Sequence, residues 1–510
     1  MPAEPPPQLA PLAELAQITK AYPNGVVALR GVDLALRTGE VHALVGENGA
    51  GKSTLVKVLF GLEAASSGEV RLLGKPVSGH SPATAIAAGI GMVHQHFKLV
   101  PSLTAAENLV LGAEPLRRGC FDRAGARRAA VVLADRLGVR IDPDARAANL
   151  PVGDQQRLEI MKALHRGANV LILDEPTSVL TPQEADRLLT SVRALADNGT
   201  GVVFITHKLR EVMAVADMVT VLRDGLRVTT IPRADATVDG LARAMVGRDV
   251  VPPGRDAVAA TGPVRLRLTG VSTGGSGRGR LQRVDLEVRA GEIVGVAGVE
   301  GNGQDDLVDV VTGLRPPAAG SVELDDRDVT RWTVGRRRRR GLAHIAADRV
   351  RRGVALDASL AANITADRVA GQYSRHGVLD RTAIHQAGRT AMTQFEIRAA
   401  DPSTPVSSLS GGNLQKVVVA RELSGDPGVV VAAHPTRGVD LGAMALIHEA
   451  LLARRSAGGA VLLVSSELDE LRRLSDRIVV LSDGSLVATF DDPTGTADET
   501  LGRAMAGAVG

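Results

Sequence analysis

The sequence predicts an α/β protein that contains two similar domains in tandem. In both halves of the chain, apolar runs typical of buried strands alternate with amphipathic stretches typical of helices. The segment from Ala28 to Glu40 is echoed by the segment from Leu281 to Glu292, and Gly46 recurs as Gly298. These two glycines are 252 residues apart, far more than the ~20–50 residues of a solenoid repeat, so the pattern indicates a duplicated domain.

The domain boundaries follow from composition. Residues 251–263 are rich in proline and glycine and are predicted to form a 13-residue linker. We therefore expect a flexible N-terminus over residues 1–11, a first domain over residues 12–250 and a second domain over residues 264–510. Within the first domain, residues 100–165 are rich in predicted helix, and we expect a helical subdomain to be inserted there.

Composition argues against several classes of protein. Hydrophobic residues make up 44% of the chain and charged residues 23%, the balance of a soluble globular protein. The single cysteine, Cys120, excludes a disulfide framework and argues against zinc or iron–sulfur sites, so we expect a reducing cytosol. No apolar stretch approaches the ~18 residues of a membrane span, and the N-terminal residues lack the features of a secretory leader. A net charge of +3 and an aromatic content of 2% give no case for nucleic-acid binding.

The segment from Gly46 to Thr54 matches the phosphate-binding motif G-x-x-x-x-G-K-[ST], the P-loop. It lies between Val41–Val45, a predicted buried strand, and Leu55–Phe60, a predicted helix, which is the context that the motif requires. The glycines allow successive backbone N–H groups and the helix N-terminus to face phosphate oxygens. Lys52 is expected to reach the β- and γ-phosphates, and the Ser53 hydroxyl can coordinate Mg²⁺. We therefore predict a nucleoside triphosphate site formed by Gly46, Glu47, Asn48, Gly49, Ala50, Gly51, Lys52, Ser53 and Thr54.

Polar side chains end two further apolar runs. Asp174 and Glu175 end the run that begins at Val170, and His207 ends the run that begins at Val202. In an open α/β sheet the ligand lies beyond the carboxyl ends of the strands, so these side chains are expected to converge on the P-loop. Asp174 can bind the Mg²⁺ that bridges the β- and γ-phosphates, and Glu175 can orient and deprotonate an attacking water. His207 is positioned to sense the γ-phosphate.

Three other features have competing interpretations. Gln95 ends a short strand and can contact Mg²⁺ and the attacking water, although a solvated loop amide accounts for it almost as well. Tyr22, which we place before the first pair of strands, offers a flat face for a nucleotide base, and ordinary packing is an equal alternative. The arginine run Arg336–Arg340 can contact anionic lipid, but a turn of solvated helix is favoured.

In their order along the chain, these motifs resemble one ATP-binding cassette (ABC) from end to end, and residues 264–505 resemble a second. The fused pair is similar to the ATPase subunit of bacterial ABC importers for simple sugars and nucleosides, and the resemblance covers nearly the whole chain. It implies two tandem P-loop ABC nucleotide-binding domains, each with a helical subdomain. Three loops look more like the nucleoside branch than the ribose branch: His94–Asn108, Leu150–Gly153 and Ala432–Gly438.

The second copy lacks most of the chemistry expected of an ATP site. At the positions that match Lys52 and Ser53 it has Gln304 and Asp305, and Asp306 follows, so two carboxylates are expected to repel a triphosphate. The other replacements are Ala347 for Gln95, Ala433 for Asp174, His434 for Glu175 and Ser466 for His207, and no aromatic residue near Val271 takes the place of Tyr22.

Leu409–Asn413 nevertheless closely resembles the signature motif of the family. The resemblance implies that this segment contacts the γ-phosphate of ATP bound to the partner cassette. In the first copy Pro151 stands at the position of Ser410 and lacks an N–H group. Cassettes of this family pair head to tail, so all the altered residues fall in one composite site, and we predict one hydrolytic and one degenerate ATP site per chain. The signature residues are Ser410, Gly411, Gly412 and Asn413.

The resemblance also implies cofactors and partners. ATP and Mg²⁺ are the expected cofactors, and polytopic membrane permease subunits are the expected partners, with an extracytoplasmic solute-binding protein acting through them at the far side of the membrane. The protein itself is expected at the cytoplasmic face. A soluble tandem cassette that acts on ribosomes is the alternative, but the 13-residue linker and the altered second copy argue against it. A DNA-repair cassette is disfavoured by the single cysteine and the lack of heptad repeats.

Overall fold

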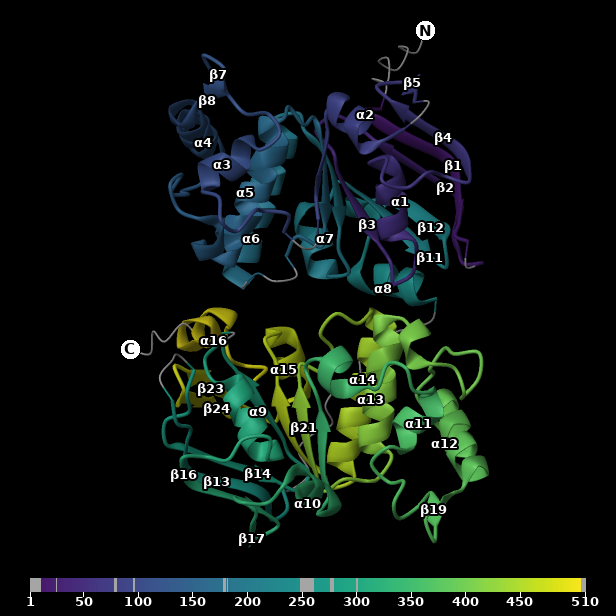
Figure 1. Cartoon of the computed structure of the whole chain (residues 1–510), viewed down its shortest axis with the longest axis vertical. Coiled ribbons are helices and arrows are strands. Elements are labelled where there is room, and N and C mark those ends of the chain that lie inside the picture. The colour runs from purple at the N-terminus through teal and green to yellow at the C-terminus, as the bar shows by residue number, and fades with distance from the viewer. Residues whose placement is uncertain are drawn as a thin grey trace. The chain divides into compact units, whose positions relative to one another are not determined.

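The computed structural model describes residues 11–23, 25–77, 80–94, 97–177, 180, 182–247, 261–275, 279–299 and 301–505. Its contacts divide the chain into two compact parts, Met1–Val250 and Val251–Gly510, called unit 1 and unit 2 below. In each unit a central sheet has a smaller antiparallel sheet on one side and a group of helices on the other (Figure 1). Most of the expected N-terminal segment and most of the predicted linker lie outside the described residues.

The core of unit 1 is a six-stranded sheet of five parallel strands with one antiparallel strand at its edge. The strands predicted at residues 41–45 and 170–174 are confirmed, and the strand predicted from Val202 begins one residue earlier. Every residue of the two central strands is buried, as expected of parallel strands that are covered on both faces. In sheet order the strands are β12 (Leu226–Pro232), β11 (Met218–Arg223), β3 (Val41–Val45), β10 (Gly201–Ile205), β9 (Val170–Asp174) and β6 (Ile90–Val93).

The second sheet of unit 1 is antiparallel and packs with helix α1 (Lys52–Leu59) in one hydrophobic cluster. The predicted helix after the P-loop is therefore confirmed, although it begins three residues before Leu55. Tyr22 lies directly after the first strand and before the second, so the expectation that it precedes both was wrong. The strands, in sheet order, are β2 (Val27–Leu36), β1 (Ala13–Ala21), β4 (Ser67–Leu72) and β5 (Lys75–Pro76).

The helical group of unit 1 occupies the region predicted for it. Two of its helices begin at well-formed caps: the Thr104 side chain and the Glu107 side chain make a reciprocal capping box, and Asp122 accepts a hydrogen bond from Gly125 N–H. Its helices are α3 (Ala105–Val110), α4 (Arg123–Leu137), η1 (Ala147–Asn149) and α5 (Val152–His165), with a hairpin of β7 (Leu116–Arg117) and β8 (Cys120–Phe121). The other helices of unit 1 are α2 (Pro82–Ala87), α6 (Pro182–Asp197), α7 (Leu209–Val215), η2 (Arg233–Asp235) and α8 (Val238–Val246).

Unit 2 repeats this architecture, as the internal repeat predicts. Its six-stranded sheet has the same parallel core and antiparallel edge: β18 (Leu342–Ile345), β21 (Val429–Ala433), β22 (Ala460–Val464), β15 (Ile293–Ala297), β23 (Arg477–Ser482) and β24 (Ser485–Phe490). The antiparallel sheet contains β14 (Val284–Arg289), β13 (Val264–Ser272), β16 (Ala319–Leu324) and β17 (Arg327–Asp328), and a hairpin pairs β19 (Ser374–Arg375) with β20 (Val378–Leu379). The helices are α9 (Gln304–Thr312), α10 (Val334–Arg339), η3 (Arg349–Gly353), α11 (Leu360–Thr365), α12 (Arg381–Gln394), η4 (Val406–Ser408), α13 (Gly411–Leu423), α14 (Leu441–Ser456), α15 (Leu468–Leu474) and α16 (Asp498–Met505).

The arginine run Arg336–Arg340 is not the solvated helical turn that its composition favours. Arg337 is 0% exposed, and its guanidinium donates hydrogen bonds to four backbone carbonyls at 2.6–3.0 Å. Arg338 makes ion pairs with two carboxylates, and Arg336 stacks 3.9 Å from the centre of the Trp332 ring. Only Arg339 and Arg340 fit the expected pattern of exposed side chains without tertiary contacts. Two of the five arginines therefore belong to the interior of unit 2.

Across the described part of the chain, none of the helices has both the length and the apolar character needed to cross a bilayer.

Candidate active site

The P-loop of unit 1 is shaped by two glycines whose positions exclude a side chain. Gly46 has φ 153°, and a Cβ there would lie 2.2 Å from the Leu222 carbonyl oxygen. Gly51 has φ 103°, and a Cβ there would lie 2.6 Å from the Ala28 carbonyl oxygen. Because α1 begins immediately after Gly51, the N–H groups of its first turn, which have no acceptor within the helix, border the loop. The loop thus has the close-packed backbone and the helix N-terminus that an anion site requires.

Lys52 is the cation of this loop. Its side chain is folded back over the P-loop and donates hydrogen bonds to the carbonyls of Gly46 at 2.7 Å and Glu47 at 3.0 Å. Only 6% of the residue is exposed, so its charge is held among the backbone groups of the loop. Ser53 is exposed, as a side chain that could coordinate a metal ion must be.

Tyr22 lies beside the start of α1. Its hydroxyl is 3.4 Å from Thr54 Oγ1, and the Lys20 ammonium lies 5.1 Å from the centre of its ring. Lys20 is itself held by an ion pair with Glu63 at 2.9 Å. These contacts place the ring beside the P-loop helix, where the base-stacking hypothesis needs it, and the cation–π contact with Lys20 could not be predicted from the motifs.

Asp174, Glu175 and His207 lie at the carboxyl ends of β9 and β10, as predicted. Glu175 has φ 47°, uncommon for a residue with a side chain, and its N–H donates to the Ile205 carbonyl at 3.0 Å. His207 Nδ1 lies 3.1 Å from Glu175 Oε1. The hydrogen bond from His207 is the main reason why the pKa of Glu175 is lowered, whereas burial, together with the charge of Glu175, raises the pKa of Asp174.

A buried carboxylate behind these residues fixes the two loops that carry them. Glu211, on α7, accepts hydrogen bonds from Thr177 Oγ1 at 2.6 Å and from Thr206 Oγ1 at 2.9 Å. Thr177 follows β9 and Thr206 follows β10, so one side chain joins the segments after both strands. Sequence reasoning missed Glu211 because it lies on a separate helix and belongs to no motif.

Gln95, for which we predict a role in catalysis and metal binding, lies outside the described residues.

The residues present fit ATP with Mg²⁺. The P-loop packs so closely that a Cβ at Gly46 would collide with the Leu222 carbonyl, and Lys52 supplies a cation within the loop. Asp174 is a half-buried carboxylate whose pKa is raised by burial and by the charge of Glu175, and a divalent cation beside Ser53 would favour its ionised form. The described residues contain no group of three or more His, Cys, Asp or Glu side chains arranged to hold a metal. A site with Asp174 as its single carboxylate ligand agrees with this, because Mg²⁺ in nucleotide sites takes most of its remaining ligands from phosphates and water.

Unit 2 keeps the backbone of this site while its side chains differ. Gly303 caps α9 at φ 113°, as Gly51 caps α1, and Gln304 donates to the Val299 carbonyl at 3.1 Å. His434 occupies the strained position of Glu175: its φ is 44°, and its N–H donates to the Val464 carbonyl at 2.7 Å. The glycine at the start of the helix and the turn after the strand therefore keep their backbone geometry in unit 2, but the lysine and the two acids are absent.

Asp306 does not leave an unbalanced charge in unit 2, contrary to our expectation. Its carboxylate pairs with Arg280 at 3.1 Å and with Arg315 at 2.6 Å. It also accepts a hydrogen bond from Thr273 Oγ1 at 2.6 Å. Thr273 stands after β13 as Tyr22 stands after β1. The place that an aromatic ring and Thr54 occupy in unit 1 is thus filled in unit 2 by an internal ion-pair cluster.

The signature segment of unit 2 begins a helix, as the motif predicts. Ser410 is the N-cap of α13, and its Oγ accepts hydrogen bonds from Asn413 Nδ2 at 3.0 Å and from Asn413 N–H at 3.4 Å. Ser410 is exposed, and a Cβ on Gly412 would lie 2.8 Å from Asp440 Oδ2. In unit 1, Pro151 begins α5 with no side-chain cap. Only unit 2 therefore presents a hydroxyl at this helix N-terminus.

Comparison with known proteins identifies the family. The family model described as "ABC transporter" matches residues 29–178 and 281–437. The chain belongs to this family. It is an ATP-binding protein and an ATPase with two ABC domains. It is 43% identical over 505 residues to the guanosine import ATP-binding protein NupO of Bacillus subtilis, and the match covers 97% of each chain.

Other relatives extend the comparison. The ribose import ATP-binding protein RbsA 1 of Rubrobacter xylanophilus is 41% identical, over 98% of this chain and 99% of the relative. Among solved structures, the archaeal ribosome recycling factor aABCE1, in complex with the ribosomal stalk protein aP1, superposes with a TM-score of 0.65. That match covers 96% of this chain and 92% of the solved one, but the identity is 19%, so the likeness concerns the fold alone.

Proposed function

We propose that the chain is the ATP-hydrolysing subunit of a membrane importer for a simple sugar or nucleoside, with one catalytic ATP site per chain. Support for the importer class comes from relatives named for guanosine import and ribose import, which match almost end to end at 41–43% identity. The nucleoside branch is favoured by the loops around Leu150 and Ala432, whereas the two identities are too close to separate nucleoside from sugar. The proposal implies permease subunits and a solute-binding protein as partners, and a position at the cytoplasmic face of the membrane.

The observation that carries the single-site proposal is the division of functional groups between the units. Unit 1 has the P-loop lysine and the acids after β9, and unit 2 has the capped signature helix. At the matching positions, unit 2 has Gln304 and His434, and unit 1 has Pro151. None of these residues supplies the cation, the carboxylate or the hydroxyl of its counterpart. In a head-to-tail pairing of the two cassettes, the intact groups would form one site and the altered groups the other.

In this proposal each residue of unit 1 has a defined task. Lys52 and the P-loop N–H groups bind the phosphates, and Tyr22 stacks on the base. Ser53 and Asp174, with Gln95, would hold Mg²⁺, which when bound neutralises charge on the phosphates. Glu175 accepts a proton from the attacking water, and His207 keeps Glu175 ionised and oriented through their 3.1 Å contact. Ser410 of unit 2 donates a hydrogen bond to the γ-phosphate.

The test of the catalytic face compares matched substitutions in the two units. Glu175→Gln should keep ATP binding and slow hydrolysis by about 10²–10⁴-fold, because it removes a positioned general base. His434→Ala, at the matching position of unit 2, should change hydrolysis little. Saturation binding should give one catalytically competent ATP per chain. Equal losses in the two variants, or equal turnover at two sites, would show that the working face is wrongly assigned.

A second test concerns the signature. Ser410→Ala should slow turnover by roughly ten- to a hundredfold, since a hydrogen bond to a charged partner contributes about 1.5–3 kcal/mol. Pro151→Ser should not create a second active site, because Gln304 and His434 would remain. If Ser410→Ala is silent while changes at Pro151 abolish turnover, the pairing of unit 1 with the signature of unit 2 is wrong. Co-purification with a polytopic membrane protein supports the importer, and co-purification with ribosomes contradicts it.

A further inference from the structure

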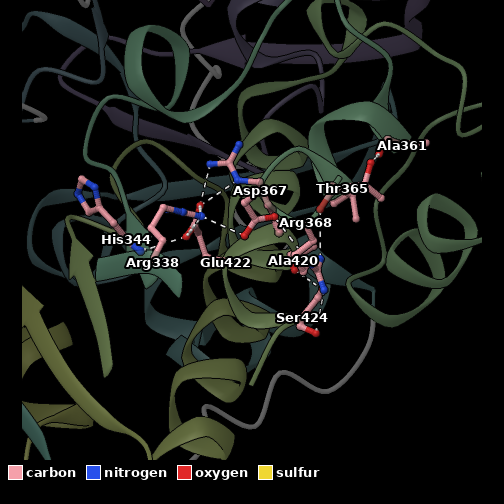
Figure 2. A network of polar contacts seen from close by, with 11 residues as sticks. Arg338, His344, Ala361, Thr365, Asp367, Arg368, Ala420, Glu422 and Ser424 are labelled. Carbon is pink, nitrogen blue, oxygen red and sulfur yellow. Dashed lines mark hydrogen bonds and ion pairs between the residues drawn. The ribbon is translucent and has the colours of Figure 1, made fainter. Parts of the chain in front are cut away.

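A buried cluster of ion pairs in unit 2 joins helices that are distant in sequence. Figure 2 shows Arg338 reaching toward both Glu422 and Asp367. Arg338 Nη2 lies 2.9 Å from Glu422 Oε2 and 3.1 Å from Asp367 Oδ2. Arg421 adds a second cation at 2.9 Å from Glu422 Oε1. Because the Glu422 side chain is 0% exposed, these contacts are weakly screened by solvent and salt.

The cluster anchors one end of the signature helix. Glu422 is the penultimate residue of α13, and Ser410 caps the opposite end. Arg338 belongs to α10, and the backbone N–H of His344, on strand β18, donates to Glu422 Oε2 at 3.0 Å. The C-terminal end of α13 is therefore tied both to an edge strand of the central sheet and to the helix that precedes that strand.

The segment after β18 supports α13 at two more points. A Cβ added at Gly353 would lie 3.0 Å from Val418 Cγ2, so this segment packs against the middle of the helix. Near the N-terminal end, the guanidinium of Arg349 packs against Gly411: a Cβ added at Gly411 would lie 2.8 Å from Arg349 Nη2. Arg349 is held there by a hydrogen bond to the Arg437 carbonyl at 2.7 Å. Strand β18 and its flanking residues therefore contact α13 near its start, at its middle and, through the ion pairs, at its C-terminal end.

In unit 1, the described residues that match Arg338 and Glu422 carry no charge. The repeat places Ile86 at the position of Arg338, Met92 at that of His344 and Ala163 at that of Glu422. Ala163 instead packs closely on strand β6, since a Cβ on Gly91 would lie 2.8 Å from Ala163 Cβ. At this position the signature helix that lacks a serine makes an apolar contact, whereas the one that has the serine makes buried ion pairs; a carboxylate of α5, Glu159, instead accepts a hydrogen bond from the Lys98 N–H elsewhere along the helix.

We propose that Arg338 and Glu422 are positioning residues for ATP hydrolysis, which set the direction of α13 and through it the place of Ser410. This inference rests on the proposed function, in which Ser410 serves the ATP bound to unit 1. Ser410 and Glu422 are twelve residues apart, about 18 Å along a helix. A tilt of about 5° at the anchored end would move Ser410 by roughly 1.6 Å at that lever length, and a displacement near 1 Å can cost about 10²-fold in rate.

The test measures kcat and the ATP affinity of the full-length chain with its partners. Arg338→Met removes the cation, and Glu422→Gln removes the anion while keeping an acceptor for the His344 N–H. Each should lower kcat by about tenfold and leave the ATP affinity measured in a Glu175→Gln background nearly unchanged, because the P-loop face is untouched. Arg338→Lys, which keeps the charge, should retain most of the turnover. If Arg338→Met is too unstable to purify, Glu422→Gln and Arg338→Lys carry the comparison.

A double-mutant cycle separates positioning from loss of stability. If Arg338 acts through Ser410, then Arg338→Met should have little further effect on kcat in a Ser410→Ala background. The matched control is Arg455→Met, which breaks another buried ion pair of unit 2, with Asp476 at 2.6 Å; neither residue belongs to α13. It should lower the unfolding temperature and leave kcat unchanged at temperatures where the protein is folded.

The outcomes distinguish this inference from the function on which it rests. If Ser410→Ala leaves kcat unchanged, the proposed role of the signature is wrong and the positioning role is wrong with it. If Ser410→Ala slows turnover but Arg338→Met and Glu422→Gln do not, only the positioning role is wrong. The same holds if the Arg338→Met effect is fully additive with that of Ser410→Ala, or if Arg455→Met lowers kcat as much.

Discussion

Replacement of Arg337 by methionine should destabilise unit 2 far more than replacement of Arg339 or Arg340, the two exposed arginines of the run. The guanidinium is fully buried and donates to the carbonyls of Val310, Val311, Val329 and Thr330. Val310 and Val311 lie in the last turn of α9, where the Val310 carbonyl also accepts a hydrogen bond from the Gly313 N–H at 3.2 Å, so Arg337 adds a cation to the C-terminal end of that helix. Burial lowers the pKa of Arg337 to about 10, which leaves it charged at neutral pH.

The expected size of the effect follows from these contacts. Hydrogen bonds that involve a charged group contribute about 1.5–3 kcal/mol each, and water that enters the vacated space would compensate for part of that loss. We therefore expect Arg337→Met to lower the free energy of unfolding of unit 2 by about 3–5 kcal/mol, at the upper end of what single substitutions do. Arg339→Met, which removes an exposed side chain from the same helix, should change it by about 0.5 kcal/mol or less.

The chain provides its own probe for this experiment. Trp332 is the only tryptophan, and it lies in unit 2 with Arg336 stacked 3.9 Å from its ring centre. Its fluorescence during a urea titration should report the unfolding of unit 2 in the wild type and in both variants. Equal midpoints for Arg337→Met and Arg339→Met would refute the assignment of Arg337 to the interior.

Two further predictions concern unit 1. Gly46→Ala should abolish measurable nucleotide binding, because its Cβ would collide with the Leu222 carbonyl, whereas Gly49→Ala, which meets no atom within 4 Å, should weaken binding only through its positive φ of 84°. Titration calorimetry with ATP would compare the two, and equal affinities would contradict the account of the loop. His207→Ala should raise the pKa of Glu175, since the hydrogen bond from His207 is what chiefly lowers it. A base must be deprotonated to act, so the acidic limb of the kcat/KM profile should move to higher pH, and an unmoved limb would argue against Glu175 as the base.

The features that sequence predicts best in this chain are local ones. The strand at Val41–Val45, the glycines of the P-loop and the cap at Ser410 depend on neighbouring residues, and all have the predicted backbone. The placement of Asp174 and Glu175 needed one further rule, that parallel strands end at a common edge, and it also holds. Whether these residues perform the chemistry assigned to them stays a prediction.

What sequence could not predict depends on residues brought together by the fold. The run Arg336–Arg340 has the composition of a solvated surface, and nothing local indicates that carbonyls of residues 310–330 surround Arg337. The charge of Asp306 is balanced by Arg280, a partner 26 residues away that belongs to no motif. Glu211 joins two strand-end segments from a helix, and only the folded chain shows which carboxylate does so. In each case a tertiary contact overrides the local pattern.

The ion-pair cluster around Asp306 makes the loss of the second nucleotide site hard to reverse. Had only the lysine been replaced, as Gln304 stands at the place of Lys52, one substitution could restore the cation. Asp306, however, has become the shared counter-charge of Arg280 and Arg315. A threonine there would leave two partly buried arginines without their shared carboxylate, so restoring an ATP site would require changes at these positions as well as at Gln304. The packing of the cluster, and not the single lysine position alone, therefore separates the two halves.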